Sequence, residues 1–123
     1  MPAFSRLIAP YVKKELAIAN NAQQNGQPEL AFAHLERAHV LGQASTYWHV
    51  YVHIKMLIWA VQNPKPREFL GQVIRIIGAF LLTALKGVPE GNTGGSNVSL
   101  VAPMPIPHDL KSILDTVKKQ CQH

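Results

Sequence analysis

Helix-breaking residues divide this 123-residue chain into apolar segments, each about as long as one helix. The breaks fall at Asn25-Gly26, at Gly42, at residues 63–66 and at Gly87. Glycine often ends a helix in the left-handed conformation, and proline cannot continue one, so each break separates two elements. We therefore predict an all-α fold, in which residues 1–123 form a single domain built as a compact bundle of about five helices.

Apolar residues at helical spacing give the expected bounds of these helices. They are residues 10–24, 28–42, 46–62, 67–86 and 107–120. Residues 1–9 lead in, and Pro10 is expected in the first turn, where its missing N–H leaves no hydrogen bond unmade. Ser45 is the expected cap of the third helix. A strand over residues 47–54 is the alternative, because aromatic and β-branched residues gather there, but the length of the segment favours a helix.

The second half of the predicted fourth helix, residues 76–85, is apolar on every face. It is half as long as the roughly 20 apolar residues that a membrane span needs, so we expect no membrane span. A helix of this kind is normally buried, which makes it the core helix of the bundle. Partial exposure in a homodimer is the alternative.

Residues 88–107 form an unusually long loop before the last helix. The loop carries several apolar side chains, and we therefore predict that it is ordered and packs across the helices. These side chains are Val98, Leu100, Val101, Met104 and Ile106.

The first two helices resemble a single tetratricopeptide repeat. The matching residues are the small or apolar ones where two helices would approach closely, with a glycine in the turn: Ala19, Ala22, Gly26, Ala31, Leu35 and Ala38. The resemblance covers about one repeat, whereas arrays need about three, so it implies a tetratricopeptide-like helix hairpin and little about a partner.

The charge and the single cysteine limit the function classes. The net charge of +5 is spread over the whole chain, which is typical of a solvated surface and disfavours nucleic-acid binding. Cys121 stands alone, so neither an intrachain disulfide nor a thiolate metal cluster is available. The first residues lack the apolar core of a signal peptide, and we expect a cytoplasmic protein.

Four of the six histidines lie within twenty residues, in the second and third predicted helices. His49 and His53 are four residues apart and share a helix face, as Glu36 and His39 do at a spacing of three. If the two helices form a hairpin that turns near residues 43–44, His39 lies level with about His49, and His34 lies level with about His53. His39, His49 and His53 can then converge as metal ligands, with Glu36 as a fourth ligand or as the group that orients one.

His34 is the weakest member of this group. It lies five residues from His39, which is about 140° around a helix, so the two rings do not both face the third helix. Imidazole and carboxylate ligands without thiolate suit zinc, copper, nickel or iron. The alternative is that the histidines are ordinary half-buried residues of a packed hairpin.

A glycine-rich segment inside the long loop is the second candidate site. Consecutive glycines expose backbone N–H groups that can hold an anion, and the segment comprises Asn92, Thr93, Gly94, Gly95 and Asn97. It lacks the lysine of a phosphate-binding Walker motif. The alternative is that Gly94 and Gly95 only allow the chain to reverse direction.

Four motifs together resemble a small bacterial family of helical proteins with no assigned function. They are His34-Leu-Glu-Arg-Ala-His39, the His49/His53 pair, Gly91-Asn-Thr-Gly-Gly95 and Pro103-Met-Pro-Ile-Pro107. The resemblance spans nearly the whole chain and implies an association with heavy-metal resistance genes. It supplies no catalytic residue.

These observations predict a cytoplasmic metal-binding accessory protein that uses the histidine cluster. The alternative is a non-catalytic protein-interaction module, or a homodimeric helical scaffold, that needs no metal. An enzyme with a pocket between the glycine-rich segment and the histidines is a third hypothesis. It is disfavoured because the sequence shows no Ser-His-Asp or Cys-His arrangement.

Overall fold

The computed structural model describes residues 2–63, 71, 74–75, 78 and 105–122. Over these residues the fold is all-α, as predicted, with no strand. The helices are α1 (Ala3–Gln24), α2 (Pro28–Gly42), α3 (Thr46–Gln62) and α5 (His108–Cys121). The predicted fourth helix and the long loop lie almost entirely outside the described residues, so the five-helix bundle stays a prediction.

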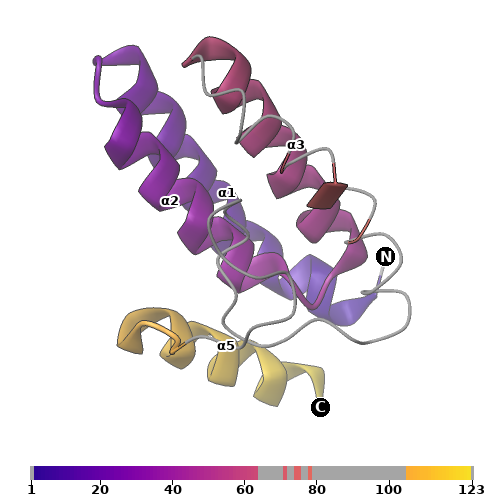
Figure 1. Cartoon of the computed structure of the whole chain (residues 1–123). Coiled ribbons are helices and arrows are strands. Elements are labelled where there is room, and N and C mark those ends of the chain that lie inside the picture. The colour runs from indigo at the N-terminus through magenta and orange to yellow at the C-terminus, as the bar shows by residue number, and fades with distance from the viewer. Residues whose placement is uncertain (1, 64–70, 72–73, 76–77, 79–104, 123) are drawn as a thin grey trace.

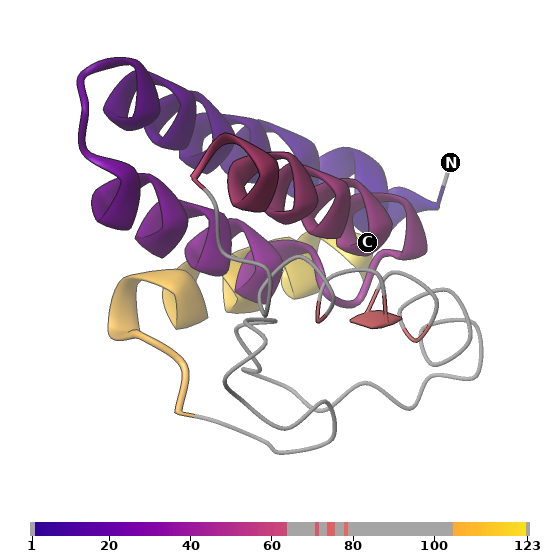
Figure 2. The same ribbon diagram turned by 45° about the horizontal axis from the view of Figure 1, so that its top comes forward.

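α1, α2 and α3 run side by side in alternating directions, and α5 lies across α1 and α2 near one end (Figures 1 and 2). α5 buries Leu110, Leu114 and Val117 in the core, which are three of the four apolar positions that helical spacing places on one face. None of the described helices has the length and apolar character needed to cross a membrane.

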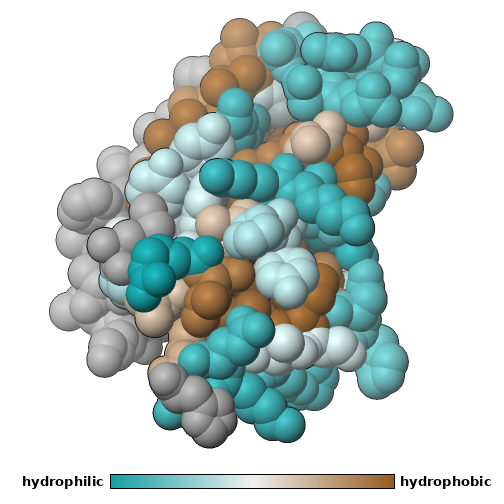
Figure 3. Space-filling model, turned by 180° about the vertical axis from the view of Figure 1, so that it is seen from behind, coloured by the Kyte–Doolittle hydropathy of each residue, from teal (hydrophilic) through white to brown (hydrophobic). Residues whose placement is uncertain are grey.

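The turn between α1 and α2 follows the sequence prediction. Gly26 adopts a φ of 73°, which an L-residue with a side chain rarely does. The amide N–H of Gln27 donates to the carbonyl of Ala22 at 2.9 Å, and that of Gly26 donates to the carbonyl of Gln23 at 3.2 Å. These two bonds make a Schellman motif, which satisfies carbonyls at the end of α1. Polar side chains cover this turn, at the upper right of Figure 3.

The start of α1 was predicted incorrectly. The helix begins at Ala3, and Pro10 lies inside it. A proline inside a helix removes one backbone hydrogen bond and costs about 3 kcal/mol. Contacts made by the first turns offset this cost: Ile8 is fully buried, and the buried Ser5 hydroxyl lies 2.7 Å from the hydroxyl of Ser45. Packing therefore overrides the local preference of proline for the first turn.

α2 and α3 are joined by a short turn that brings them into close contact. The Ser45 hydroxyl accepts a hydrogen bond from the Trp48 amide at 3.2 Å, as expected of an N-cap, and α3 excludes the strand alternative over residues 47–54. Gly42 has no left-handed φ, and its role is steric. A Cβ atom there would lie 2.8 Å from the Cβ of Trp48.

Candidate metal centre

The structure brings together three histidines from two helices. His39 lies in the last turn of α2, and His49 and His53 lie one turn apart on α3. The Nε2 atom of His39 is 2.9 Å from Nε2 of His49 and 3.1 Å from Nε2 of His53. One ligand atom from each ring falls within 4.8 Å of the other two, so the cluster could hold a metal ion.

The local sequence explains why the three rings meet. A spacing of four residues puts His49 and His53 on one face of α3. The short turn between α2 and α3 makes them neighbouring antiparallel helices, and the contact between Gly42 and Trp48 holds their adjoining ends close. His39 stands three residues before Gly42, where the two helices are still close together.

The cluster is almost completely shielded from solvent. The exposed fraction is 2% for His39 and His49 and 0% for His53. The ring of His39 meets the rings of His49 and His53 edge to face, at centroid distances of 4.6 and 4.7 Å. A site this enclosed can hold an ion, but it leaves little room for a substrate.

Burial also determines the protonation state of His49. Burial, together with the smaller electrostatic effect of the neighbouring His53, lowers the pKa of His49 to about 3. His49 is therefore neutral near pH 7. A neutral imidazole has one nitrogen without a proton, and that nitrogen is the atom that binds a metal.

His34 takes part in a different cluster. Its Nδ1 atom lies 2.7 Å from Oε1 of Glu15, and the Arg37 Nε atom donates to the same carboxylate oxygen at 3.0 Å. Arg37 also pairs with Asp109 of α5. His34 thus belongs to a hydrogen-bonded network between α1, α2 and α5 and is not among the three histidines whose ligand atoms converge.

Glu36 is half-buried on α2, one turn before His39, and is not among the three residues whose ligand atoms converge. Its predicted role as a fourth ligand or as an orienting group stays a prediction.

Gln43 is a further candidate, which the sequence motifs did not single out. This residue continues the helical conformation of α2, and its spacing of four places it on the same face as His39. It is 6% exposed, and its buried Oε1 accepts no hydrogen bond from the residues that the structure describes. Burying an amide oxygen that accepts no hydrogen bond is energetically unfavourable. The spacing of four residues from His39 was the sequence signal that could have identified Gln43.

One known protein family matches most of the chain. The family described as "Protein of unknown function (DUF3703)" matches residues 6–114. The chain belongs to this family. No curated protein and no solved structure shows a significant match to the chain. The family description assigns no activity, so the geometry of the site is the evidence for the function of this DUF3703 protein.

The matched range of DUF3703 includes all three converging histidines. It also includes Asn92, Thr93, Gly94, Gly95 and Asn97, the candidate anion-binding segment. These five residues lie outside the described part of the structure, and their role stays a prediction.

Proposed function

We propose that this protein binds one transition-metal ion through His39, His49 and His53. The observation that carries the proposal is the convergence of three imidazole nitrogens at a buried point between α2 and α3. The separations of Nε2 of His39 from Nε2 of His49 and of His53, 2.9 and 3.1 Å, support it. Metal–nitrogen bonds of about 2.0–2.1 Å, at angles from 90° to 109°, place ligand nitrogens roughly 2.8–3.4 Å apart.

The proton balance of the cluster also favours a cation. Nε2 of His39 faces the Nε2 atoms of both other rings. A neutral imidazole carries one N–H, so a hydrogen bond between two of these nitrogens uses the proton of one ring and the lone pair of only one other. A metal ion accepts all three lone pairs at once. The competing arrangement is a proton-sharing histidine triad that serves only the core.

The ligand set suggests which metals bind. Three neutral imidazoles without thiolate suit zinc, copper or nickel. Glu36, Gln43 or a water molecule would complete the coordination. Because the site is shut off from solvent, the protein would hold the ion rather than use it in catalysis. Together with the family resemblance, this supports a cytoplasmic accessory protein that acts alongside heavy-metal resistance systems.

Calorimetric titration of the purified full chain with zinc, copper and nickel tests the proposal. We expect one saturable site per chain for at least one of these metals. The His53→Gln variant should bind at least 100-fold more weakly. The matched control is His34→Gln, which alters a histidine outside the cluster and should bind as the native chain does.

Circular dichroism on each variant would show that the helices are intact. Cobalt(II) provides a second readout, because its visible absorption depends on the ligands and their geometry. Absence of saturable binding, or equal binding by the native chain and His53→Gln, would refute the metal proposal and leave the proton-sharing triad.

A further inference from the structure

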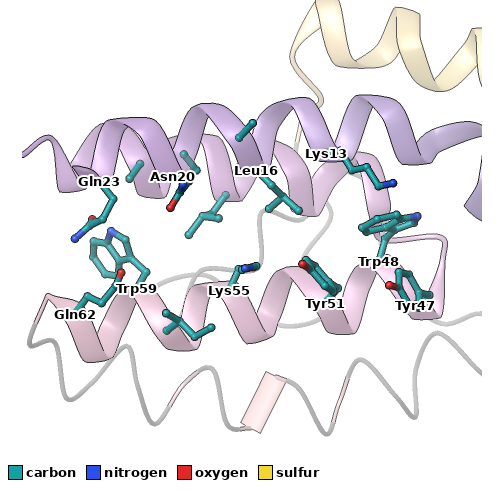
Figure 4. A pocket seen from close by; sticks show the side chains of 15 residues that line it. Lys13, Leu16, Asn20, Gln23, Tyr47, Trp48, Tyr51, Lys55, Trp59 and Gln62 are labelled. Carbon is teal, nitrogen blue, oxygen red and sulfur yellow. The ribbon is translucent and has the colours of Figure 1, made fainter. Parts of the chain in front are cut away.

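A groove of about 580 Å³ lies between α1 and α3 (Figure 4), and its lining does not include His39, His49 or His53. α1 and α3 supply its two sides, and α2 contributes Ala31 and Leu35. The groove is elongated. Its lining residues on α3 extend from Tyr47 to Gln62, which at 1.5 Å per residue is a length of about 22 Å.

Aromatic side chains dominate the α3 side of the groove: Tyr47, Trp48, Tyr51 and Trp59. The two indoles are held in place. Nε1 of Trp48 donates to the Ser5 carbonyl, and Nε1 of Trp59 donates to the Pro28 carbonyl, both at 2.9 Å. Tyr47 is half exposed, and so is the lining residue Ile58. Because Trp48 and Trp59 are only 4% and 9% exposed, they form the rigid floor of the groove, and Tyr47 and Ile58 offer the exposed surface that a partner would contact.

At both ends of the groove, side-chain contacts connect α1 to the residues that flank α3. At one end, Gln23 of α1 and Asn63 after α3 exchange side-chain hydrogen bonds of 3.3 and 3.1 Å. At the other end, the hydroxyls of Ser5 and Ser45 lie 2.7 Å apart. These contacts fix the separation of α1 and α3, so the groove is formed before any partner binds. A preformed site lowers the cost of binding.

The charged side chains that the structure describes in the groove have one sign. Among the described residues, its lining contains Lys13 and Lys55 and no acidic residue. Nζ of Lys55 lies 5.4 Å from the centroid of the Tyr51 ring, so this cation stands over an aromatic face. Two lysines are too few for strong binding to a nucleic-acid backbone. The two lysines are enough to favour the binding of a negatively charged peptide whose apolar side chains contact the aromatic rings.

We propose that this groove binds an acidic segment of a partner protein that also carries apolar side chains. Its length and open form fit about four helical turns or a shorter extended peptide, rather than a compact metabolite. The surface is separate from the metal centre, and the proposal does not rest on metal binding.

Peptide selection on the full chain tests this proposal. The probe is a library of random 16-residue peptides displayed on phage, selected against the immobilised protein in the presence of a chelator. We expect the enriched peptides to combine Asp or Glu with Leu, Phe or Trp. A synthetic enriched peptide without tryptophan should change the fluorescence of the protein, because both of its tryptophans line the groove.

A charge reversal locates the binding site. The double variant Lys13→Glu/Lys55→Glu should weaken peptide binding at least ten-fold. The control is the double variant Lys118→Glu/Lys119→Glu, which makes the same charge change on α5, outside the groove, and should leave peptide binding unchanged. His53→Gln should also bind the peptide normally. Selection of peptides without acidic residues, no enrichment at all, or equal weakening by the two double variants would overturn the proposal.

Discussion

At the scale of single residues, Gly42 decides how closely α2 and α3 approach. It is the position where an added Cβ would lie 2.8 Å from the Cβ of Trp48 and 3.6 Å from Val12. The atoms around such a Cβ belong to Trp48, through its Cβ and its backbone, and to the buried Val12, so no flexible side-chain end could move away. His39 precedes Gly42 by one turn, so the same contact supports the position of a proposed ligand.

Gly42→Ala should therefore destabilise the fold by about 1–3 kcal/mol, as overpacking of a core usually does. Urea unfolding followed by circular dichroism would measure the loss. Gly26→Ala is the matched control, because nothing lies within 4 Å of a Cβ there and only the positive φ is strained. We expect about 1 kcal/mol from that variant. A Gly42→Ala protein as stable as the native chain would contradict the steric role.

At the scale of elements, an ionic network links α1, α2 and α5. Glu15 of α1 is buried and receives His34 and Arg37 of α2 on one carboxylate oxygen. Arg37 extends the network to the exposed Asp109 of α5, and its hydrogen bond lowers the pKa of that carboxyl group. The buried and exposed ends of this network should contribute differently to stability.

Glu15→Gln should cost about 3 kcal/mol, because it leaves Arg37 without its buried partner charge. Asp109→Asn should cost less than about 1 kcal/mol, since exposed ion pairs contribute little. The free energy of unfolding in urea at pH 7 would compare the two. Because the folded-state pKa of Asp109 is lowered, its contribution is present at pH 7 and disappears as the pH falls below about 4. Equal losses from both variants would be inconsistent with this division.

At the scale of the whole molecule, the histidine cluster makes metal-free stability depend on pH. The pKa of His49 is about 3 in the fold and about 6.5 in the unfolded chain. Below pH 6.5 the unfolded state binds more protons, so acid favours unfolding. Above pH 6.5 both states leave His49 neutral, and its effect on the pH dependence ends.

Metal-free protein should therefore lose up to about 1.4 kcal/mol for each pH unit between pH 6.5 and 3 on account of His49. Urea unfolding in the presence of a chelator at a series of pH values would measure this slope. His49→Gln removes the titrating group and should give a flatter profile. An unchanged slope in His49→Gln would show that other groups cause the acid sensitivity.

The sequence predicted α2 and α3 well because their signals are local. Pro28 and Ser45 begin these helices as expected, and the bounds of both match the predicted residues. The prediction of α1 was wrong at its start, because burial of Ile8 and the contact of Ser5 with α3 outweigh the preference of Pro10. Those contacts join residues forty positions apart, which local spacing does not reveal.

By itself, the sequence determined that His49 and His53 share a helix face, since this follows from the helical repeat alone. It also determined that His34 and His39 point in different directions. Only the tertiary structure decided where those directions lead: His39 meets both rings of α3, whereas His34 meets Glu15 of α1. The groove between α1 and α3 likewise exists only once the helices are placed. The physical reason is that a helix fixes relative angles within one segment, while side-chain packing between segments fixes their partners.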